Sequence, residues 1–334
     1  MLKIGFVGAG ALGKIHINCL KEINDFDLIG FYDSDSIQAK KIAKELNIKL
    51  FGSLDELIHA VDVVDIINPN FSNYECAVKA IRKSKHVFID KPIINSNGES
   101  KNLMELAHEA NVKVQIGHSE RFSAAYKNAL PYFSNPMYIE SNSLAEFKNA
   151  DKNNSVVFDL MIHDIYIVLS IIKSTVKKIS ATGVSVISNN PDIVNARIEF
   201  DNGCVANLTS SRISLKNRHK TRIFQKELCL TIDFFNKETS ILRFQENDEK
   251  IEKTNQTEGL EQLFETHGIQ NESIKCEHEN AVKNELESFY NCILNNTNPE
   301  VTIEDGYNAM NIAQQIIEKI KLTTNLLEFD NKTY

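Results

Sequence analysis

The feature that most constrains the fold is a glycine motif near the start of the chain, Gly8-Ala9-Gly10-Ala11-Leu12-Gly13. It follows an apolar, β-branched run and opens a segment with helical spacing, which is the context that Gly-x-Gly-x-x-Gly requires in a dinucleotide-binding turn. The first glycine permits the tight turn, the second lets backbone approach a pyrophosphate at the positive helix N-terminus, and the third lets helix and strand pack closely. The motif predicts a dinucleotide site at Gly8, Gly10, Ala11, Leu12 and Gly13. A glycine-rich turn without a ligand is the alternative.

An acidic residue follows this motif at the distance that dinucleotide-binding folds use. Asp33 ends the second apolar run, about twenty residues after Gly13. Its carboxylate can accept hydrogen bonds from the adenosine ribose diol, and its charge would repel a 2'-phosphate. Ser34, Asp35 and Ser36 come next, so no arginine stands there to bind that phosphate. The sequence therefore predicts NAD in preference to NADP, with a helix N-cap as the competing interpretation of Asp33.

Short β-branched runs alternate with helical patterns from Leu2 to about Gly117, which predicts a parallel sheet wound with helices. The helical patterns include Ser34 to Leu46 and Ser72 to Lys83. The expected strands are Lys3 to Val7, Leu28 to Tyr32, Val61 to Ile67, His86 to Ile89 and Val112 to Ile116.

After Phe122 the runs become longer and predict a large, mostly antiparallel sheet, with a strong hairpin signal at Asp201-Asn202-Gly203. Residues 245–280 are polar and acidic, so we expect a mobile excursion there. The fold class is thus an α/β Rossmann domain, residues 1–121, followed by an α+β substrate and oligomerisation domain, residues 122–334, with an open sheet. The helices expected in this half are Val156 to Ile172, about Glu279 to Leu294, and Ile303 to Leu322.

The composition predicts two domains, each with its own hydrophobic core, and a small molecule as the binding partner. A chain of 334 residues with 42% hydrophobic content suits two domains, and a net charge of -8 opposes broad attraction to nucleic acid or anionic lipid. No apolar run approaches the ~20 residues of a membrane span and no signal peptide opens the chain, so we expect a cytoplasmic protein. The cysteines lie far apart without C-x-x-C spacing, which predicts reduced thiols and no metal site. They are Cys19, Cys76, Cys204, Cys229, Cys276 and Cys292.

A lysine follows the fourth expected strand, in Asp90-Lys91-Pro92. Ligands of open α/β sheets bind outside the carboxyl ends of the strands, so Lys91 is expected at the nicotinamide end of the cleft. A lysine there can stabilise a developing alkoxide. A solvated surface lysine is the competing interpretation.

A polar stripe marks the apolar helix VVFDLMIHDIYIVLSII. Asp159, His163, Tyr166 and Ser170 are spaced four, three and four residues apart and therefore share one helix face. A histidine on an apolar helix is more often a satisfied core residue, but an aspartate one turn earlier supplies the orienting carboxylate of a general base. We expect His163 to be that base and Asp159 its partner. Asp164, on another face, is expected to be a structural partner.

These three motifs occur in the order and spacing of one family, and nearly the whole chain resembles the Gfo/Idh/MocA oxidoreductases. The resemblance implies a Rossmann domain joined to an α+β domain, a nicotinamide cofactor, and a sugar or cyclitol oxidised at a secondary alcohol. It also implies that Lys91 is the lysine of the E-K-P motif, and that Asp159 and His163 are the carboxylate and the base.

The chain departs from the family pattern at several positions that bear on the contacts to substrate and nicotinamide. Asp90 replaces the usual glutamate, Asn73 stands where many members have histidine, and Tyr166 replaces a frequent aspartate. Asn68-Pro69 takes the place of a Thr-Pro pair, and the resemblance implies that it contacts the cofactor, as does Lys91.

A narrower likeness lies in QIGHSERFSAA, VVFDLMIHDIYIVLS and IVNARIEFDNGCVANLTSSRIS, which are similar to UDP-N-acetylglucosamine 3-dehydrogenases that prepare a 3-amino sugar for lipid A. This likeness implies oxidation of the sugar 3-hydroxyl and functional coupling to a PLP-dependent aminotransferase. Within these segments His118, Arg121 and Tyr166 are candidate substrate-binding residues.

A basic stretch stands out in the acidic second half and could meet a substrate diphosphate. We interpret it as a loop that offers Arg212 and Lys216 to the substrate, while a solvated loop between strands is the alternative. Its basic residues are Arg212, Lys216, Arg218, Lys220 and Arg222.

The sequence thus favours an NAD-dependent dehydrogenase in which His163 removes the hydroxyl proton and Lys91 stabilises the alkoxide. Two alternatives stay open: the same chemistry on another sugar or an inositol, and a non-catalytic NAD-binding sensor or scaffold. The presence of Lys91, Asp159 and His163 together argues against the second. An open sheet face would also seek a partner, so a homo-dimer or homo-tetramer is expected.

Overall fold

The computed structural model describes residues 1–67, 73–90, 97–148, 154–244, 270–276 and 280–330. The chain divides into two compact units, one made of Met1–Phe122 with Asn280–Met310 and the other of Ser123–Glu279 with Asn311–Tyr334. The sequence predicts a second domain that covers all of 122–334. In the structure, the segment 280–310 belongs to the first.

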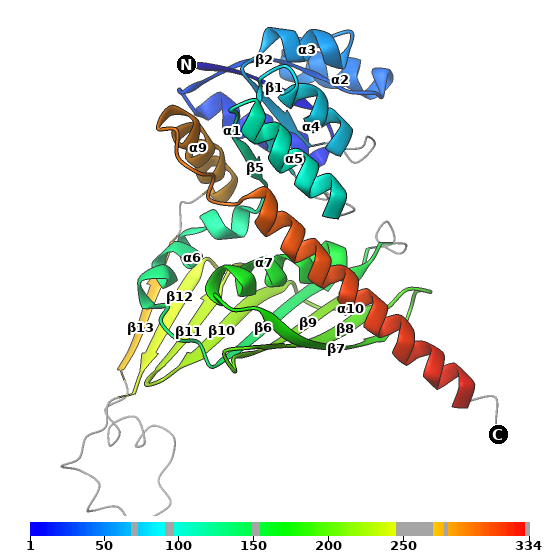
Figure 1. Ribbon diagram of the computed structural model, residues 1–334, viewed down its shortest axis with the longest axis vertical. Helices are drawn as coiled ribbons and strands as arrows, with labels where there is room; N and C mark the ends of the chain where they lie inside the picture. Colours follow the sequence, from blue (N-terminus) through cyan, green and yellow to red (C-terminus); the bar gives the residue numbers. More distant parts are fainter. Residues whose placement is uncertain (68–72, 91–96, 149–153, 245–269, 277–279, 331–334) are drawn as a thin grey trace, which may run out of the picture. The chain divides into compact units, whose positions relative to one another are not determined.

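The first unit contains a five-stranded parallel sheet in the order β2-β1-β3-β4-β5 (Figure 1). This confirms the predicted Rossmann topology, and the strand order reverses beside β1, where α/β sheets of this kind bind nucleotides. The bounds of the predicted strands differ from the observed ones by no more than a few residues. The strands are β1 (Leu2–Val7), β2 (Phe26–Tyr32), β3 (Val63–Ile66), β4 (His86–Ile89) and β5 (Val114–Ile116).

Helices complete this unit and cover both faces of the sheet, whose strand residues are mostly apolar and buried. On one side, Leu20 of α1 and Phe289 of α9 pack against Ile4, Val63 and Phe88 of the sheet. The late helix α9 therefore supplies part of the core of the N-terminal unit. The helices are α1 (Ala11–Glu22), α2 (Ser36–Leu46), α3 (Leu54–Ala60), α4 (Asn73–Ile81), α5 (Asn97–Glu109), η1 (Ser119–Phe122), α9 (Ala281–Leu294) and the beginning of α10 (Ile303–Asp330).

The second unit contains an eight-stranded sheet in the order β13-β12-β11-β10-β6-β9-β8-β7. Only the β6–β9 pair is parallel among these neighbours, which confirms the mostly antiparallel sheet. The strands are β6 (Tyr138–Glu146), β7 (Val176–Val184), β8 (Ile193–Phe200), β9 (Val205–Ser214), β10 (Arg218–Gln225), β11 (Leu228–Asp233), β12 (Glu238–Arg243) and β13 (Gln270–Lys275).

Two turns of this sheet bear on the sequence predictions. The predicted hairpin at Asp201-Asn202-Gly203 is confirmed, and Gly203 has a φ of 86°, in the left-handed region that glycine tolerates. The expected excursion over 245–280 is too long, because Gln270–Lys275 within it form the strand β13, which pairs with β12. Residues 245–269 and 277–279 lie outside the described residues.

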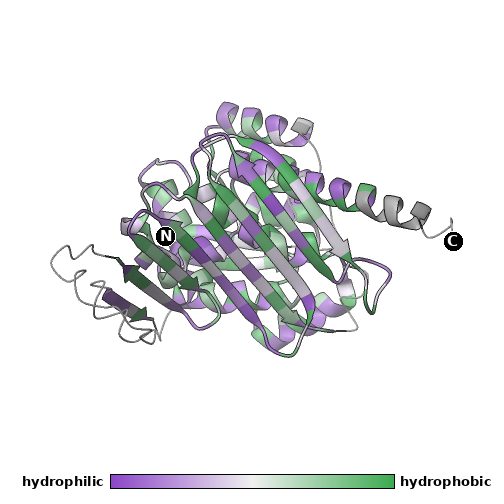
Figure 2. Cartoon of the chain, turned by 90° about the horizontal axis from the view of Figure 1, so that it is seen from below, coloured by the Kyte–Doolittle hydropathy of each residue, from purple (hydrophilic) through white to green (hydrophobic). Residues whose placement is uncertain are grey.

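The helices of the second unit lie on one face of its sheet (Figure 1). They are α6 (Ala124–Ala129), η2 (Leu130–Tyr132), the π-helix η4 (Val157–Met161), α7 (Ile162–Ile171) and the later part of α10. Figure 2 shows the other face, where hydrophilic and hydrophobic residues alternate along the strands. On that face Lys220 pairs with Asp233 at 3.0 Å and Arg222 with Glu140 at 3.5 Å. Among the described residues, no helix of this unit covers that face, which agrees with the open sheet that the sequence predicts.

All six cysteines are free, and five of them are buried while Cys276 is partly exposed. Within the described ranges no helix is long and apolar enough to cross a membrane.

Candidate functional site

The glycine motif forms the tight connection between β1 and α1, and each glycine has a different physical reason to be there. Gly8 has a φ of 96°, which a residue with a side chain rarely adopts. A Cβ on Gly13 would lie 2.4 Å from the carbonyl oxygen of Gly8, so only glycine lets the helix approach the strand. A Cβ on Gly10 would meet no described atom within 4 Å, so that position faces open space.

This turn fits a pyrophosphate. Gly10 is the N-cap of α1 and has no side chain that could cap the helix amides. The first turn of the helix contains no acidic residue. The amide groups of that turn therefore remain suited to an anion, which the positive end of the helix favours. Residues Gly8, Gly10, Ala11, Leu12 and Gly13 would hold the phosphates of a dinucleotide.

Asp33 lies directly beside the glycine turn. Its Oδ2 accepts a hydrogen bond from the backbone N–H of Ala9 at 2.7 Å, and its Oδ1 accepts one from Asp35 at 2.9 Å. Asp35, in contrast, is the N-cap of α2 and accepts from the N–H groups of Ile37 and Gln38. The capping role therefore belongs to Asp35, and Asp33 is the carboxylate fixed next to the turn.

Three candidate residues, Asn68, Pro69 and Lys91, lie outside the described residues. Their neighbours Asn73 and Asp90 are described. The side-chain amide of Asn73 donates a hydrogen bond to the carbonyl oxygen of Asp90 at 3.2 Å, so it ties the start of α4 to the end of β4.

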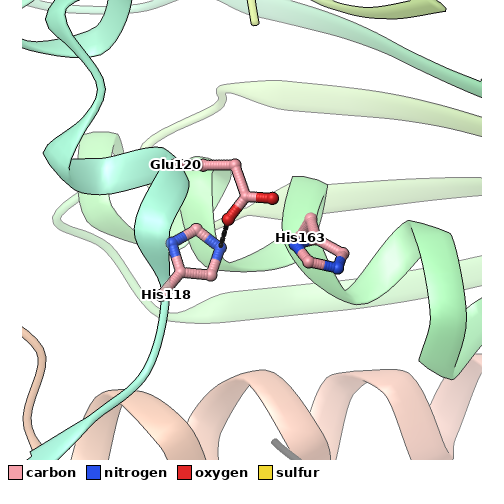
Figure 3. A group of neighbouring side chains, drawn as sticks. All are labelled: His118, Glu120 and His163. Atoms are coloured by element: carbon pink, nitrogen blue, oxygen red, sulfur yellow. Dashed lines mark ion pairs between the residues drawn. The ribbon is translucent and has the colours of Figure 1, made fainter. Parts of the chain in front are cut away.

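The segment after β5 carries His118 and Arg121, the two candidate substrate residues of the first unit. The His118 side chain is buried, and its Nε2 lies 3.7 Å from Oε2 of Glu120 (Figure 3). The Arg121 guanidinium lies 3.7 Å from Asp305 of α10. Both side chains are thus anchored at the carboxyl end of the sheet, where ligands of such folds bind.

The predicted helix from Val156 to Ile172 has two parts with different geometry. Residues Val157–Met161 form a π-helix and α7 begins at Ile162, so Asp159 lies in the π-turn and His163 in the first turn of α7. Single π-turns inside helices are frequent at functional sites. Asp159 is exposed and His163 is half-buried, as groups that meet a ligand would be. Tyr166, the third member of the polar stripe, is buried.

Next to His163 the structure has a histidine that the sequence analysis missed. His219 of β10 lies with its ring edge-to-face against His163, with the ring centroids 6.4 Å apart. Its Nε2 lies 2.9 Å from Oδ1 of Asp164, and the ring packs against Phe234 at 4.5 Å. The same Asp164 oxygen accepts a hydrogen bond from the Ser141 hydroxyl at 2.7 Å. Asp164 is therefore a structural partner, as expected, and it orients a second imidazole.

The alternation of β10 contains the signal that would have found this residue. His219 lies on the same face of the sheet as Thr221, Ile223 and Gln225, which are all buried. The basic residues of this strand lie on the other face, and they are Arg218, Lys220 and Arg222. A histidine on the covered face of a strand needs a polar partner there. The identity of that partner, Asp164, follows only from the fold.

The interpretation of 212–222 as one basic loop is wrong. Arg212 lies in β9, residues Arg218 to Arg222 lie in β10, and only the turn between the strands is a loop. The Arg212 guanidinium is buried, donates to the carbonyl oxygens of Asn154 and Pro191 at 2.7 and 3.0 Å, and lies 3.4 Å from Asp192. Through its contacts with Pro191 and Asp192, Arg212 therefore holds the segment before β8 in place. Lys216 is exposed in the turn.

Comparison with protein families gives two matches in chain order. Residues 2–118 match the family described as the oxidoreductase family with an NAD-binding Rossmann fold, GFO_IDH_MocA. Residues 113–228 match the GFO/IDH/MocA C-terminal domain. Together the two matches reach from β1 to β11 and include every described candidate residue of both units.

Individual relatives share this organisation. UDP-N-acetylglucosamine 3-dehydrogenase of Acidithiobacillus ferrooxidans is 28% identical over 87% of this chain and 88% of its own length, and its solved structure matches 96% of this chain and 98% of its own with a TM-score of 0.85. A scyllo-inositol 2-dehydrogenase (NAD(+)) of Bacillus subtilis is 27% identical over 64% of this chain and 68% of its own length. Scyllo-inositol dehydrogenase of Lactobacillus casei, solved with bound NAD(H) and scyllo-inositol, has the same fold, with a TM-score of 0.76 at 22% identity and coverage of 97% and 98%.

Proposed function

Because the chain belongs to the Gfo/Idh/MocA oxidoreductase family, with its NAD-binding Rossmann fold, we propose that it is an NAD-dependent dehydrogenase of a sugar secondary hydroxyl. The substrate we propose is UDP-N-acetylglucosamine, oxidised at the sugar 3-hydroxyl. The observation that carries the cofactor assignment is the glycine turn with Asp33 fixed beside it at 2.7 Å from the Ala9 nitrogen. The similarity of 28% over 87% of the chain to an enzyme of that name supports the substrate.

The proposed mechanism divides the work between three side chains. His163 takes the proton of the substrate hydroxyl as a general base, while Lys91 stabilises the developing alkoxide. Asp159 orients the imidazole of His163. When bound, NAD supplies the acceptor for the hydride that leaves the carbon bearing this hydroxyl. His118, Arg121, Tyr166 and Lys216 are proposed to contact the substrate, whereas Arg212 would act through the segment that it holds.

The first expected result concerns the choice of cofactor. The protein should bind NADH more tightly than NADPH, because the Asp33 carboxylate suits a ribose diol and repels a 2'-phosphate. Fluorescence titration with both cofactors measures the ratio. Asp33→Asn should narrow the NADH-to-NADPH affinity ratio. Asp35→Asn, which removes a neighbouring negative charge but keeps an oxygen that can cap α2, should leave the ratio unchanged. Equal affinities in the unmodified protein would mean that Asp33 does not face the ribose.

The second expected result concerns the substrate. UDP-N-acetylglucosamine with NAD should give a small NADH signal, because oxidation of a secondary alcohol by NAD is uphill near neutral pH. The signal should grow several-fold when a PLP-dependent aminotransferase and glutamate remove the ketone as a 3-amino sugar. This aminotransferase is the functional partner that we propose for the protein.

The matched substrates in this assay are free N-acetylglucosamine and myo-inositol under the same coupling or trapping conditions. Equally efficient turnover of either compound would show that the nucleotide diphosphate contributes no recognition. The assignment to UDP-N-acetylglucosamine would then be dropped, and the dehydrogenase assignment would stand with another sugar or an inositol as substrate. We further propose that the open sheet face pairs with a second copy of the chain as a dimer or tetramer.

A further inference from the structure

Glu285 is a buried acidic residue for which the proposed mechanism has no use. It lies on α9, its side chain is in the core of the first unit, and its Oε1 accepts a hydrogen bond from the backbone N–H of His118 at 2.5 Å. Its own carbonyl oxygen accepts from the side-chain amide of Gln115 at 3.3 Å. The residue therefore contacts the chain at the point where β5 ends and the segment with the candidate substrate residues begins.

The neighbours of Glu285 hold the rest of the same segment, 118–122. The side-chain amide of Asn284 donates to the carbonyl oxygen of Phe122 at 3.2 Å. Asp305 lies 3.7 Å from the Arg121 guanidinium, and the carbonyl oxygen of Val301 accepts from the N–H of Ile116 at 3.1 Å. A stretch from 284 to 305 thus fixes both ends of the 118–122 segment, and Glu285 supplies the buried side-chain contact to the first residue of that segment.

The charges around Glu285 make an ionised carboxylate unfavourable. Burial raises the pKa of Glu285 to about 8, and the negative charges of Asp90 and Glu120 add to the rise, while the His118 N–H and His16 oppose it. His16 is already engaged, since its Nδ1 lies 2.9 Å from Asp65 in a buried pair. The groups that face Glu285 are thus His16 from α1, Asp90 after β4, and Glu120 on the segment itself.

We propose that Glu285 is a positioning residue that holds the 118–122 segment as an uncharged carboxylic acid, so that a rise in pH through neutrality weakens its hold. The uncharged acid still accepts the hydrogen bond from His118. Loss of its proton to solvent would place a third negative charge beside those of Asp90 and Glu120, on a side chain that is buried where water cannot screen it. The link to catalysis rests on the proposed function, whereas the positioning itself can be measured without a substrate.

The direction of the pH dependence follows from linkage. When the segment opens and Glu285 meets water, the pKa of its carboxyl group falls from about 8 to the ordinary 4.5. The contribution of Glu285 to holding the segment is therefore complete below about 4.5 and is lost as the pH rises through about 8. Within that window the opening equilibrium rises by at most about tenfold for each pH unit.

Hydrogen exchange of the 118–122 backbone, followed by mass spectrometry at pH 5.5 and 7.5 and corrected for intrinsic rates, tests this inference. In the unmodified protein the opening equilibrium of the segment should rise by about tenfold or more between these pH values, within the limit set by linkage. Glu285→Gln keeps an oxygen that can accept the hydrogen bond but cannot ionise, so it should remove this rise. Glu285→Leu lacks the acceptor and should exchange faster at both pH values.

Glu287→Gln is the matched control, because Glu287 lies on the same helix but is not buried. It should behave like the unmodified protein. The inference is overturned when Glu285→Gln keeps the pH dependence of the unmodified protein, or when Glu285→Leu protects the segment as well as the unmodified protein does. A failure to oxidise any sugar would count against the proposed function and leave these exchange results unaffected.

Discussion

His163→Ala is expected to lower kcat by about 10²- to 10⁴-fold, because general-base catalysis by a positioned side chain contributes that much. In the unmodified protein the rate of oxidation should fall on the acid side, since a protonated imidazole cannot accept the hydroxyl proton. The variant should lose this acid limb together with most of its activity. Steady-state oxidation rates between about pH 5.5 and 9 measure both effects.

The structure offers a control for this variant. His59 is exposed on α3, and His59→Ala should change neither the rate nor its pH profile. NADH titration should give equal affinities for both variants, which would show that the cofactor half remains folded. An acid limb that persists unchanged in the residual activity of His163→Ala would mean that another group is the base.

The second large effect is expected for Lys91→Met. Removing one group that stabilises a developing negative charge typically lowers kcat by about 10²- to 10³-fold. The affinity for NADH should stay nearly the same, because Lys91 is assigned to the reacting oxygen and not to the phosphates. Rapid-quench or steady-state kinetics give the rate, and fluorescence titration gives the affinity.

Lys79→Met serves as the control, since Lys79 is an exposed lysine in the last turn of α4. It should retain full activity. A Lys91→Met enzyme with most of its kcat would remove Lys91 from the mechanism, and one with weakened NADH binding and intact kcat would assign it to the cofactor instead.

The glycine turn and the carboxylate beside it could be predicted from the sequence because their determinants are local. Gly8, Gly10 and Gly13 act within one turn, and their roles depend on backbone angles and close approach that the motif itself specifies. Asp33 follows at the end of the next strand, where the parallel topology brings it beside the turn. Local spacing and one crossover were sufficient for this part of the site.

The substrate half could be predicted only in part, since its determinants are pairings between distant residues. His219 and Asp164 are 55 positions apart, and Glu285 and His118 are 167 apart. Neither partner reveals the other, because the pairing depends on which strand lies under α7 and on where α9 returns. The error at Arg212 has the same origin: a run of positive charge along the sequence says nothing about which face of a strand each residue occupies.

The place of α9 in the first unit has a consequence for the order of events during synthesis. Phe289 packs against Phe88 with the ring centroids 5.9 Å apart, yet about 200 residues separate them along the chain. At a translation rate of about 5 to 20 residues per second, the strand waits roughly 10 to 40 seconds for the helix that covers it. The nascent N-terminal sheet therefore leaves the ribosome with part of one apolar face uncovered while residues 123–279 of the second unit are made. The cell must keep that face from other chains until the last helices emerge.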